Sequence, residues 1–526
     1  MPGESIMKFF DIREIAKEIR EKRICVFGAG IAGSAMFSYL KMHGCRYLFV
    51  VDNDKCKHGI IDSEYEIGRF EKSVEMNMEV YLVGFFDNDN EKVKSVIDFL
   101  YNRGISEEKI KCIDFSSNWI RDFSAEYTQE ELKKIRWNIE LKKDVARIIL
   151  LGNLYNEDSK KKRTGGTTGA VNMQRILLGN QYKGIPIECM IFPKTWKTGF
   201  SELFNKYHYV LFSARFLALD AQKNDAIYIA NDVFTACALA RYRQKYILVY
   251  HGQGDFVSDL NAFGAQLTER EKQFITYVEK EAIRHSYKTF FPSKGARIHF
   301  LNTISEKIDF KDNLPLYNSI YDFPEENYEK HKHGNKLIFF SVGQMTRLKG
   351  MDRIPDFLNR VRVSTGKKIY WRVVANGEMK ENVKNQIKDI NEALDDDKKI
   401  EFEIIDYLVD HQKIYQLMAE SDIYIMLHRI SIFDFSTLEA MYMGKPIILS
   451  NVAGNDEFNV ENNILLISET TSDAEIRSFI EQKEDYGVKN RKVYDMYFST
   501  NVFRERYYKV FQELIEDERE KNIYTF

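Results

Sequence analysis

Short apolar runs alternate with longer amphipathic segments along most of the chain. In the first block, apolar runs at 23–28, 46–51, 79–85 and 109–113 are separated by segments of helical periodicity. A buried strand appears as a continuous apolar run, whereas a helix places apolar residues three and four positions apart. The alternation therefore predicts βαβ units and an α/β fold with parallel sheets.

Two further β/α blocks follow a polar connector. The second opens with the apolar run at 145–151, and the third opens with the run at 336–342. Residues 311–335 contain prolines and much charge, which makes this segment the best linker candidate. These signals divide the chain into a Rossmann-like module at 1–115, a helical connector at 116–143, α/β domains at 144–330 and 335–500, and a closing helix within 501–526.

Composition and charge exclude some classes of function. The 526 residues hold 76 Lys and Arg against 79 Asp and Glu, so no global positive field attracts nucleic acid. The six cysteines include no CxxC pair, which is typical of reduced thiols in a cytoplasmic protein. No apolar run approaches the ~20 residues of a membrane span. We expect a cytoplasmic protein, and peripheral attachment at the inner face of a membrane stays open.

A glycine motif stands at the first strand-to-helix turn. Gly28, Gly30 and Gly33 follow a predicted strand, and Asp52 ends the next strand nineteen residues after Gly33. In a dinucleotide site the glycines admit a pyrophosphate at a helix N-terminus and the acid binds a ribose hydroxyl. The block shows about four strands, however, whereas NAD normally occupies a sheet of about six. Binding of a nucleotide or NAD(P) and a scaffold without a ligand are both open.

The same block resembles a short Rossmann-like module found at the start of many bacterial polysaccharide-biosynthesis proteins. The resemblance rests on VFGAGIAG, VVDNDKCKHG and NRGISEEKIKCID within residues 20–115. The acidic triplets at 52–54 and 87–89 also suit a DxD metal site. Both triplets follow predicted strands, where Asp and Asn commonly form turns, so we expect no metal site.

Candidate chemistry is densest in the third block. In SVGQMTRLKGMDRI, Gly343 ends a strand, and the loop through Lys349 offers N–H groups and cations to a diphosphate. Ser436 and Thr437 stand at a helix start, and we expect Glu439 in its first turn. In α/β sheets, ligands bind where such loops leave the carboxyl ends of the strands.

From about 145 to 520 the chain resembles family 4 of the retaining GT-B glycosyltransferases. The resemblance is carried by SVGQMTRLKG, WRVVANGE, SDIYIMLHRISIFDFSTLEAMYMGKPIILS and YHGQGDF. It implies that the Rossmann-like module precedes a GT-B pair of Rossmann-like domains facing a cleft. It also implies transfer of a sugar from a nucleotide-sugar donor, without a required cofactor or metal.

The resemblance implies roles for individual residues of the donor side. Lys349 matches the phosphate-binding lysine. Gln344 stands where the family has Arg, and Arg347 is the candidate replacement. Glu439 matches the second Glu of the EX7E motif, which binds the ribose, whereas Ser431 replaces the first. The remaining donor-side candidates are Gly343, Ser436, Thr437, Gly377 in the GxG-like turn, and Asp406 and Leu408 near the base.

In the second block, Gly165 and Gly166 match the family's glycine loop near the donor phosphate or acceptor, and His251 matches its histidine near the donor sugar. The expected acceptor is a surface glycan or a lipid-linked saccharide. The basic run at 160–163 is either a solvated loop or a contact for lipid phosphates. Two other functions stay open: an NAD(P)-dependent oxidoreductase or sugar-modifying enzyme, and a non-catalytic nucleotide-binding protein.

Overall fold

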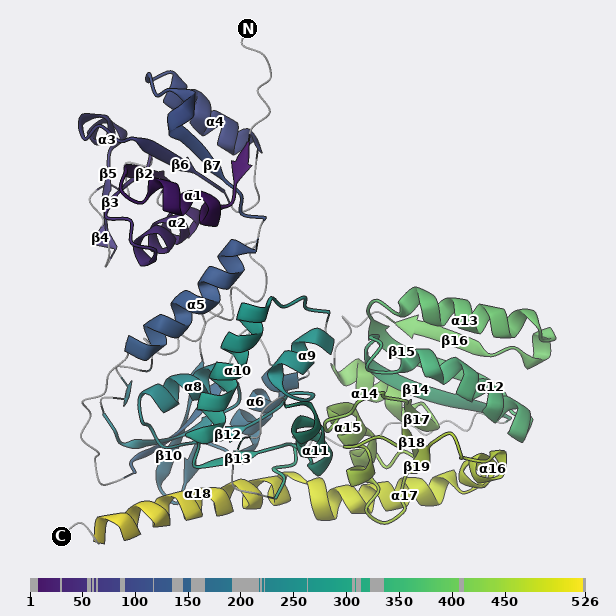
Figure 1. Ribbon diagram of the computed structural model, residues 1–526. Coiled ribbons are helices and arrows are strands. Elements are labelled where there is room, and N and C mark those ends of the chain that lie inside the picture. Colours follow the sequence, from purple (N-terminus) through teal and green to yellow (C-terminus); the bar gives the residue numbers. More distant parts are fainter. Residues whose placement is uncertain are drawn as a thin grey trace. The chain divides into compact units, whose positions relative to one another are not determined.

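The computed structural model places most of the chain in three mostly parallel β-sheets with helices on their faces (Figure 1). The predicted α/β class is confirmed. The chain divides into two compact units. Among the described residues, the first unit holds those up to Lys134 together with Leu267–Phe274, and the second holds the rest. The structure describes residues 8–523 except 29–30, 54–57, 59–60, 63–64, 86–89, 117, 135–144, 153–165, 192–216, 218–219, 222, 263, 305–307, 309–313, 322–334 and 406–410.

The first unit contains a seven-stranded sheet. Its strands are β1 (Phe9–Phe10), β2 (Arg23–Phe27), β3 (Tyr47–Val51), β4 (Ile61–Asp62), β5 (Tyr65–Gly68), β6 (Val80–Val83) and β7 (Ile110–Ile113), and its helices are α1 (Ile12–Ile19), α2 (Ile31–Met42), α3 (Phe70–Glu75), α4 (Asn90–Tyr101) and α5 (Trp119–Lys134). The strand order is β1-β7-β6-β2-β3-β5-β4, and only the β4–β5 pair is antiparallel.

The expectation of about four strands in this block was therefore too low. The four predicted strands are present, and the three additional ones are two to four residues long. So short a strand leaves no apolar run in the sequence. Residues of β2 explain why its run is continuous: Ile24 and Val26 pack in one core cluster, whereas Cys25 and Phe27 pack in another. Both faces of the sheet are buried, as parallel sheets require.

The second unit contains two six-stranded sheets. The first has the order β13-β12-β11-β8-β10-β9 and is parallel except for the β9–β10 pair. Its elements are β8 (Arg147–Gly152), α6 (Gly166–Leu177), β9 (Gln181–Tyr182), β10 (Ile185–Ile191), β11 (Ala226–Ala230), α8 (Val233–Arg241), β12 (Tyr246–Val249), α9 (Phe256–Ala262), α10 (Glu269–Arg284, which starts in the first unit), β13 (Lys288–Phe290) and α11 (Lys294–Thr303).

The other sheet of this unit has the order β16-β15-β14-β17-β18-β19 and is parallel throughout. Its elements are β14 (Lys336–Gln344), α12 (Ile354–Thr365), β15 (Lys368–Asn376), α13 (Lys380–Glu392), β16 (Glu401–Ile405), α14 (His411–Ala419), β17 (Ile423–Met426), α15 (Phe435–Tyr442), β18 (Ile447–Ser450), β19 (Leu465–Ile467), α16 (Asp473–Glu481) and α17 (Lys483–Val493).

The last helix, α18 (Thr500–Ile523), returns the chain to the first of these two sheets. Phe503, Tyr507 and Phe511 are buried in the same core cluster as Ile148 of β8 and Ile229 of β11. Their spacing of four residues places them on one face of the helix. In the part of the chain that the structure describes, no helix has the length and apolar character needed to cross a membrane.

Candidate functional site

The candidate donor site lies where β14, β15 and β17 end. These parallel strands direct their carboxyl ends to one edge of the sheet, and β14 pairs with β15 on one side and with β17 on the other. The chain fills the sheet outward from β14 in both directions. A crevice at such a change of direction is where open α/β sheets bind ligands.

Two glycines allow the loop after β14 to pack closely on its neighbours. A Cβ at Gly350 would lie 1.9 Å from the Leu427 carbonyl oxygen, and one at Gly377 would lie 2.6 Å from the Met345 carbonyl oxygen. Gly350 also has a φ of +66°. No other residue fits these positions without displacing backbone. The loop that carries Lys349 is therefore held against the ends of β15 and β17.

Lys349 is paired with a carboxylate that sequence reasoning did not select. Its Nζ lies 2.6 Å from Oδ1 of Asp434, and the Ser436 hydroxyl donates a hydrogen bond to the other carboxylate oxygen. Burial raises the pKa of Asp434, but the charge of Lys349, followed by His428, outweighs it and holds that pKa well below its usual range. The carboxylate thus stays charged and fixes the ammonium group. Its only sequence signal was an acid between two aromatic residues at a predicted helix start.

Buried polar groups without partners surround this pair. His428 is fully buried, and neither ring nitrogen has a hydrogen-bond partner among the described residues. Burial, assisted by Lys349, lowers the pKa of His428 to about 4, so the ring is neutral at pH 7. The hydroxyl of Ser431 is likewise buried without a partner in the described residues. Buried polar atoms are normally hydrogen-bonded, so their number here indicates a place for a polar ligand.

The other donor-side candidates take two kinds of position. Glu439 is buried on α15, and the Tyr415 hydroxyl donates to it at 3.4 Å. It lies beyond the first turn of that helix, since α15 begins at Phe435 and not at the predicted 437. Arg347 and Gln344 are exposed. Within the described residues, the guanidinium of Arg347 makes no hydrogen bond or ion pair, which leaves it accessible to an anion. Asp406 and Leu408 lie outside the described residues.

The acceptor-side candidates lie at the carboxyl ends of the other sheet of the unit. His251 follows β12, and its Nε2 is 3.0 Å from Oδ1 of Asn231. Burial lowers the pKa of His251 to about 4. Gly166 begins α6 with a φ of +64° and has open space where a Cβ would stand. Gly165 lies outside the described residues.

A contact between the two sheets of this unit lies beside Ser431. The Ser293 hydroxyl donates to the carbonyl of Ile432. The carboxylate of Glu457 accepts the backbone N–H groups of Lys294 and Gly295 at 2.9 and 2.8 Å. It therefore satisfies free donors at the N-terminus of α11, where negative charge is favoured. Sequence reasoning missed Glu457 because these partners, and the Tyr317 hydroxyl that also donates to it, are 140 or more residues away.

Two glycines of the motif in the first unit lie where β2 ends and α2 begins. A Cβ at Gly33 would lie 1.7 Å from the Gly28 carbonyl oxygen, so α2 packs directly on the end of β2. Gly28 has a φ of +96° and open space where a Cβ would stand. Asp52 follows β3, and Gly30 lies outside the described residues.

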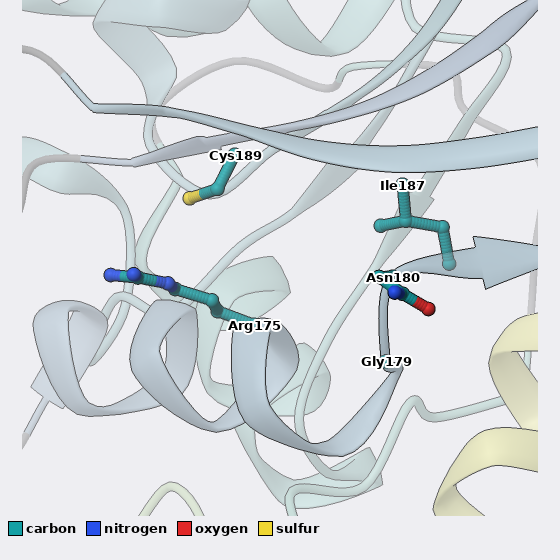
Figure 2. A pocket seen from close by; sticks show the side chains of 5 residues that line it. All are labelled: Arg175, Gly179, Asn180, Ile187 and Cys189. Atoms are coloured by element: carbon teal, nitrogen blue, oxygen red, sulfur yellow. The ribbon is translucent and has the colours of Figure 1, made fainter.

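A separate pocket is lined by residues of α6, of β10 and of the segment between them. It has a volume of about 620 Å³ and is lined by Arg175, Gly179, Asn180, Ile187 and Cys189. Figure 2 shows Arg175 on α6 and Cys189 on β10 at the same side of this space. None of the predicted site residues lines it, so we do not assign the chemistry to it.

Comparisons with known proteins find similarity for the segment that contains the candidate donor site. Residues 322–494 match the model of the family glycosyl transferases group 1. The fold is similar to that of sucrose-phosphate synthase from Thermosynechococcus elongatus, with 13% identity, a TM-score of 0.53, and coverage of 70% of this chain and 100% of that one. It is also similar to α,α-trehalose 6-phosphate synthase from Burkholderia multivorans, with 11% identity and a TM-score of 0.52. That comparison covers 73% of this chain and 99% of the synthase.

None of the curated proteins matches the chain significantly. The matched segment begins before β14 and ends at the close of α17, so it contains the loop of Lys349, the helix of Glu439 and the unpartnered polar groups between them. We conclude that the chain has a GT-B fold and that its residues 322–494 are similar to the group 1 glycosyl transferases.

Proposed function

We propose that the chain transfers a glycosyl group from a nucleoside diphosphate sugar to an acceptor hydroxyl, with retention of the anomeric configuration. The observation that carries this proposal is the set of groups between β14 and α15. A fixed lysine, an exposed arginine and several unpartnered buried polar atoms share one edge of the sheet. A diphosphate with an attached sugar supplies both the negative charge and the hydrogen-bonding groups that these residues need.

The chemistry follows from where charge develops. As the bond from the anomeric carbon to the diphosphate breaks, negative charge builds on the leaving phosphate, and Lys349 and Arg347 stabilise it. The acceptor oxygen forms the new bond to the same carbon on the same face, and its proton passes to the leaving diphosphate. Because two cations serve the leaving group, the proposed reaction needs no metal ion.

The acceptor belongs to the same proposal. The Rossmann-like first unit resembles modules of polysaccharide-biosynthesis proteins, so we propose a surface glycan or a lipid-linked saccharide made at the inner face of a membrane. The basic run at 160–163 is the proposed contact with lipid phosphates, and it lies outside the described residues.

A donor screen tests the proposal. Purified protein is incubated with a panel of nucleoside diphosphate sugars, and released nucleoside diphosphate is measured by mass spectrometry. We expect release with at least one donor, an unchanged rate with a metal chelator, and a product whose anomeric configuration by NMR equals that of the donor. Binding of a nucleoside diphosphate without release from any donor would instead support a non-catalytic binding protein.

We also propose that the first unit binds a nucleotide, NAD(P) among the candidates. The close contact of Gly33 with Gly28 and the change of direction between β2 and β6 fit the dinucleotide fingerprint. Titration of NADH, followed by energy transfer from tryptophan, tests this independently of sugar transfer. We expect the signal to weaken in Asp52→Ala. No signal at millimolar NADH would exclude the nicotinamide cofactor.

A further inference from the structure

The side chains behind His251 form a closed network of hydrogen bonds. Asn231 follows β11, Gln174 lies on α6, and both are at least 98% buried. Gln174 Nε2 donates to Asn231 Oδ1 at 2.7 Å, and Asn231 Nδ2 donates to Gln174 Oε1 at 2.8 Å. The second proton of the Gln174 amide goes to the Tyr507 hydroxyl on α18, at 2.9 Å. The network therefore connects the carboxyl end of β11 to the last helix, α18.

The orientation of the Asn231 amide follows from its contact with Leu151. A carbonyl oxygen only accepts hydrogen bonds, so the Asn231 atom 3.1 Å from the Leu151 carbonyl is the nitrogen. The amide oxygen must then face His251 Nε2, at 3.0 Å. Since that oxygen also only accepts, Nε2 carries the proton. The Leu151 carbonyl thus orients the Asn231 amide, and the amide oxygen in turn fixes the tautomer of the His251 ring.

The other ring nitrogen is left as an acceptor. Nδ1 of His251 has no hydrogen-bond partner within the described residues, and the residue is only partly buried by its surroundings. Burial alone lowers the pKa of the ring, with no contribution from a charged side chain. The acids Asp232 and Asp255 accept backbone N–H groups of the segments that follow them, whereas Glu279 on α10 accepts the N–H of Phe256 and the hydroxyl of Tyr250.

We propose that Asn231, held in place by Gln174, is a positioning residue that fixes His251 as the neutral Nε2–H tautomer, so that Nδ1 accepts a hydrogen bond from a hydroxyl of a sugar substrate. The role in transfer rests on the proposed function, whereas the tautomer does not. A neutral acceptor interacts favourably with a hydroxyl and unfavourably with a carboxylate. The substrate group at this position is therefore a hydrogen-bond donor, as a sugar hydroxyl is, and not a carboxylate.

Solid-state ¹⁵N NMR on the full chain labelled at histidine tests the tautomer directly. The resonances of His251 are assigned by their loss in His251→Gln. We expect a protonated Nε2 and an unprotonated Nδ1 at pH 7, and a mixture of tautomers in Asn231→Ala. A protonated Nδ1 in the wild-type protein, or an unchanged spectrum in Asn231→Ala, would overturn the proposal.

The pH profile of transfer tests the role of the residue in the reaction. In Asn231→Asp a carboxylate faces Nε2 and stabilises the charged ring, so we expect the acidic limb of the profile to move up by at least one pH unit. Asn180→Asp, which adds the same charge at an exposed side chain after α6, is the matched control and should leave the profile unchanged. An identical profile for parent and Asn231→Asp would refute the positioning role. If the wild-type protein transfers no sugar, the proposed function fails and the nitrogen spectrum alone decides the tautomer.

Discussion

At the scale of single residues, the site depends on how buried charges are compensated. Lys349 alone would be a mobile surface cation, since its side chain is 31% exposed. Asp434 gives it a fixed position, and the Ser436 hydroxyl completes the hydrogen bonding of that carboxylate. Fixed charges stabilise a developing anion better than mobile ones, because no reorganisation is needed at the moment of reaction.

Asp434→Asn should lower the free energy of unfolding at pH 7 by about 2 kcal/mol, because a charge-assisted hydrogen bond is lost. The pKa of Asp434 is depressed from 3.8. Its stabilisation is therefore present above that pH and is lost as the pH falls below it. In acid, the parent and Asp434→Asn should thus have similar free energies of unfolding. Urea denaturation across this range measures the difference. Asp473→Asn, at a side chain that is 57% exposed, is the control and should change stability by less than about 0.5 kcal/mol.

Glu279 provides a pH dependence of the opposite sign. Burial raises its pKa to about 7 from 4.5. The stability linked to its proton is complete below pH 4.5 and is lost as the pH rises through 7, by roughly 3 kcal/mol. Glu279→Gln keeps an acceptor for Tyr250 and should flatten this decline in thermal-unfolding profiles. A decline of equal size in the variant would show that another group causes it. Glu269→Gln, at an exposed side chain, is the control.

At the scale of elements, hydrophobic periodicity predicted the long strands, and short motifs predicted several candidate site residues. The long strands have continuous apolar runs, and short motifs pointed to the loops of Lys349 and His251 and to the helix of Glu439. The two-residue strands β1, β4 and β9 lack any pattern of their own and exist only through pairing with neighbours. Asp434, Asn231 and Glu457 were missed for a related reason. Their roles depend on partners 20 to 163 residues away, which no local pattern shows.

The N-terminus of α11 gives a prediction at this scale. Glu457→Ala leaves the N–H groups of Lys294 and Gly295 without their acceptor, so we expect a loss of about 1 kcal/mol, as for other helix caps. Amide hydrogen exchange at these two residues should accelerate, while exchange in the core of β14 stays unchanged. Glu457→Gln retains an acceptor and should restore part of the protection. Equal exchange in all three proteins would mean that the cap contributes nothing.

At the scale of the whole molecule, the first unit includes part of a helix that continues into the second. Arg121 on α5 forms two hydrogen bonds with the carboxylate of Glu271 on α10, at 3.0 and 2.6 Å. That carboxylate is fully buried. Removal of the residues before 135 would leave it without its guanidinium, so we expect these residues to be required for stability independently of any ligand.

Arg121→Met should therefore destabilise the protein by about 3–5 kcal/mol, because one partner of a buried ion pair is removed. Calorimetry of the full chain measures this loss. Arg13→Met, which removes a guanidinium that is 46% exposed, should change the melting temperature little. Equal melting temperatures for Arg121→Met and the parent would contradict a structural role of the pair.

The central claim is that the loop of Lys349 stabilises a departing nucleoside diphosphate. The most direct test compares the rate of diphosphate release from the best donor in Lys349→Met and in Lys388→Met, a lysine 73% exposed on α13. We predict a loss of at least about 100-fold in the first variant, as for removal of one transition-state donor elsewhere, and an unchanged rate in the second. Equal rates in both variants, with both proteins folded, would contradict the account.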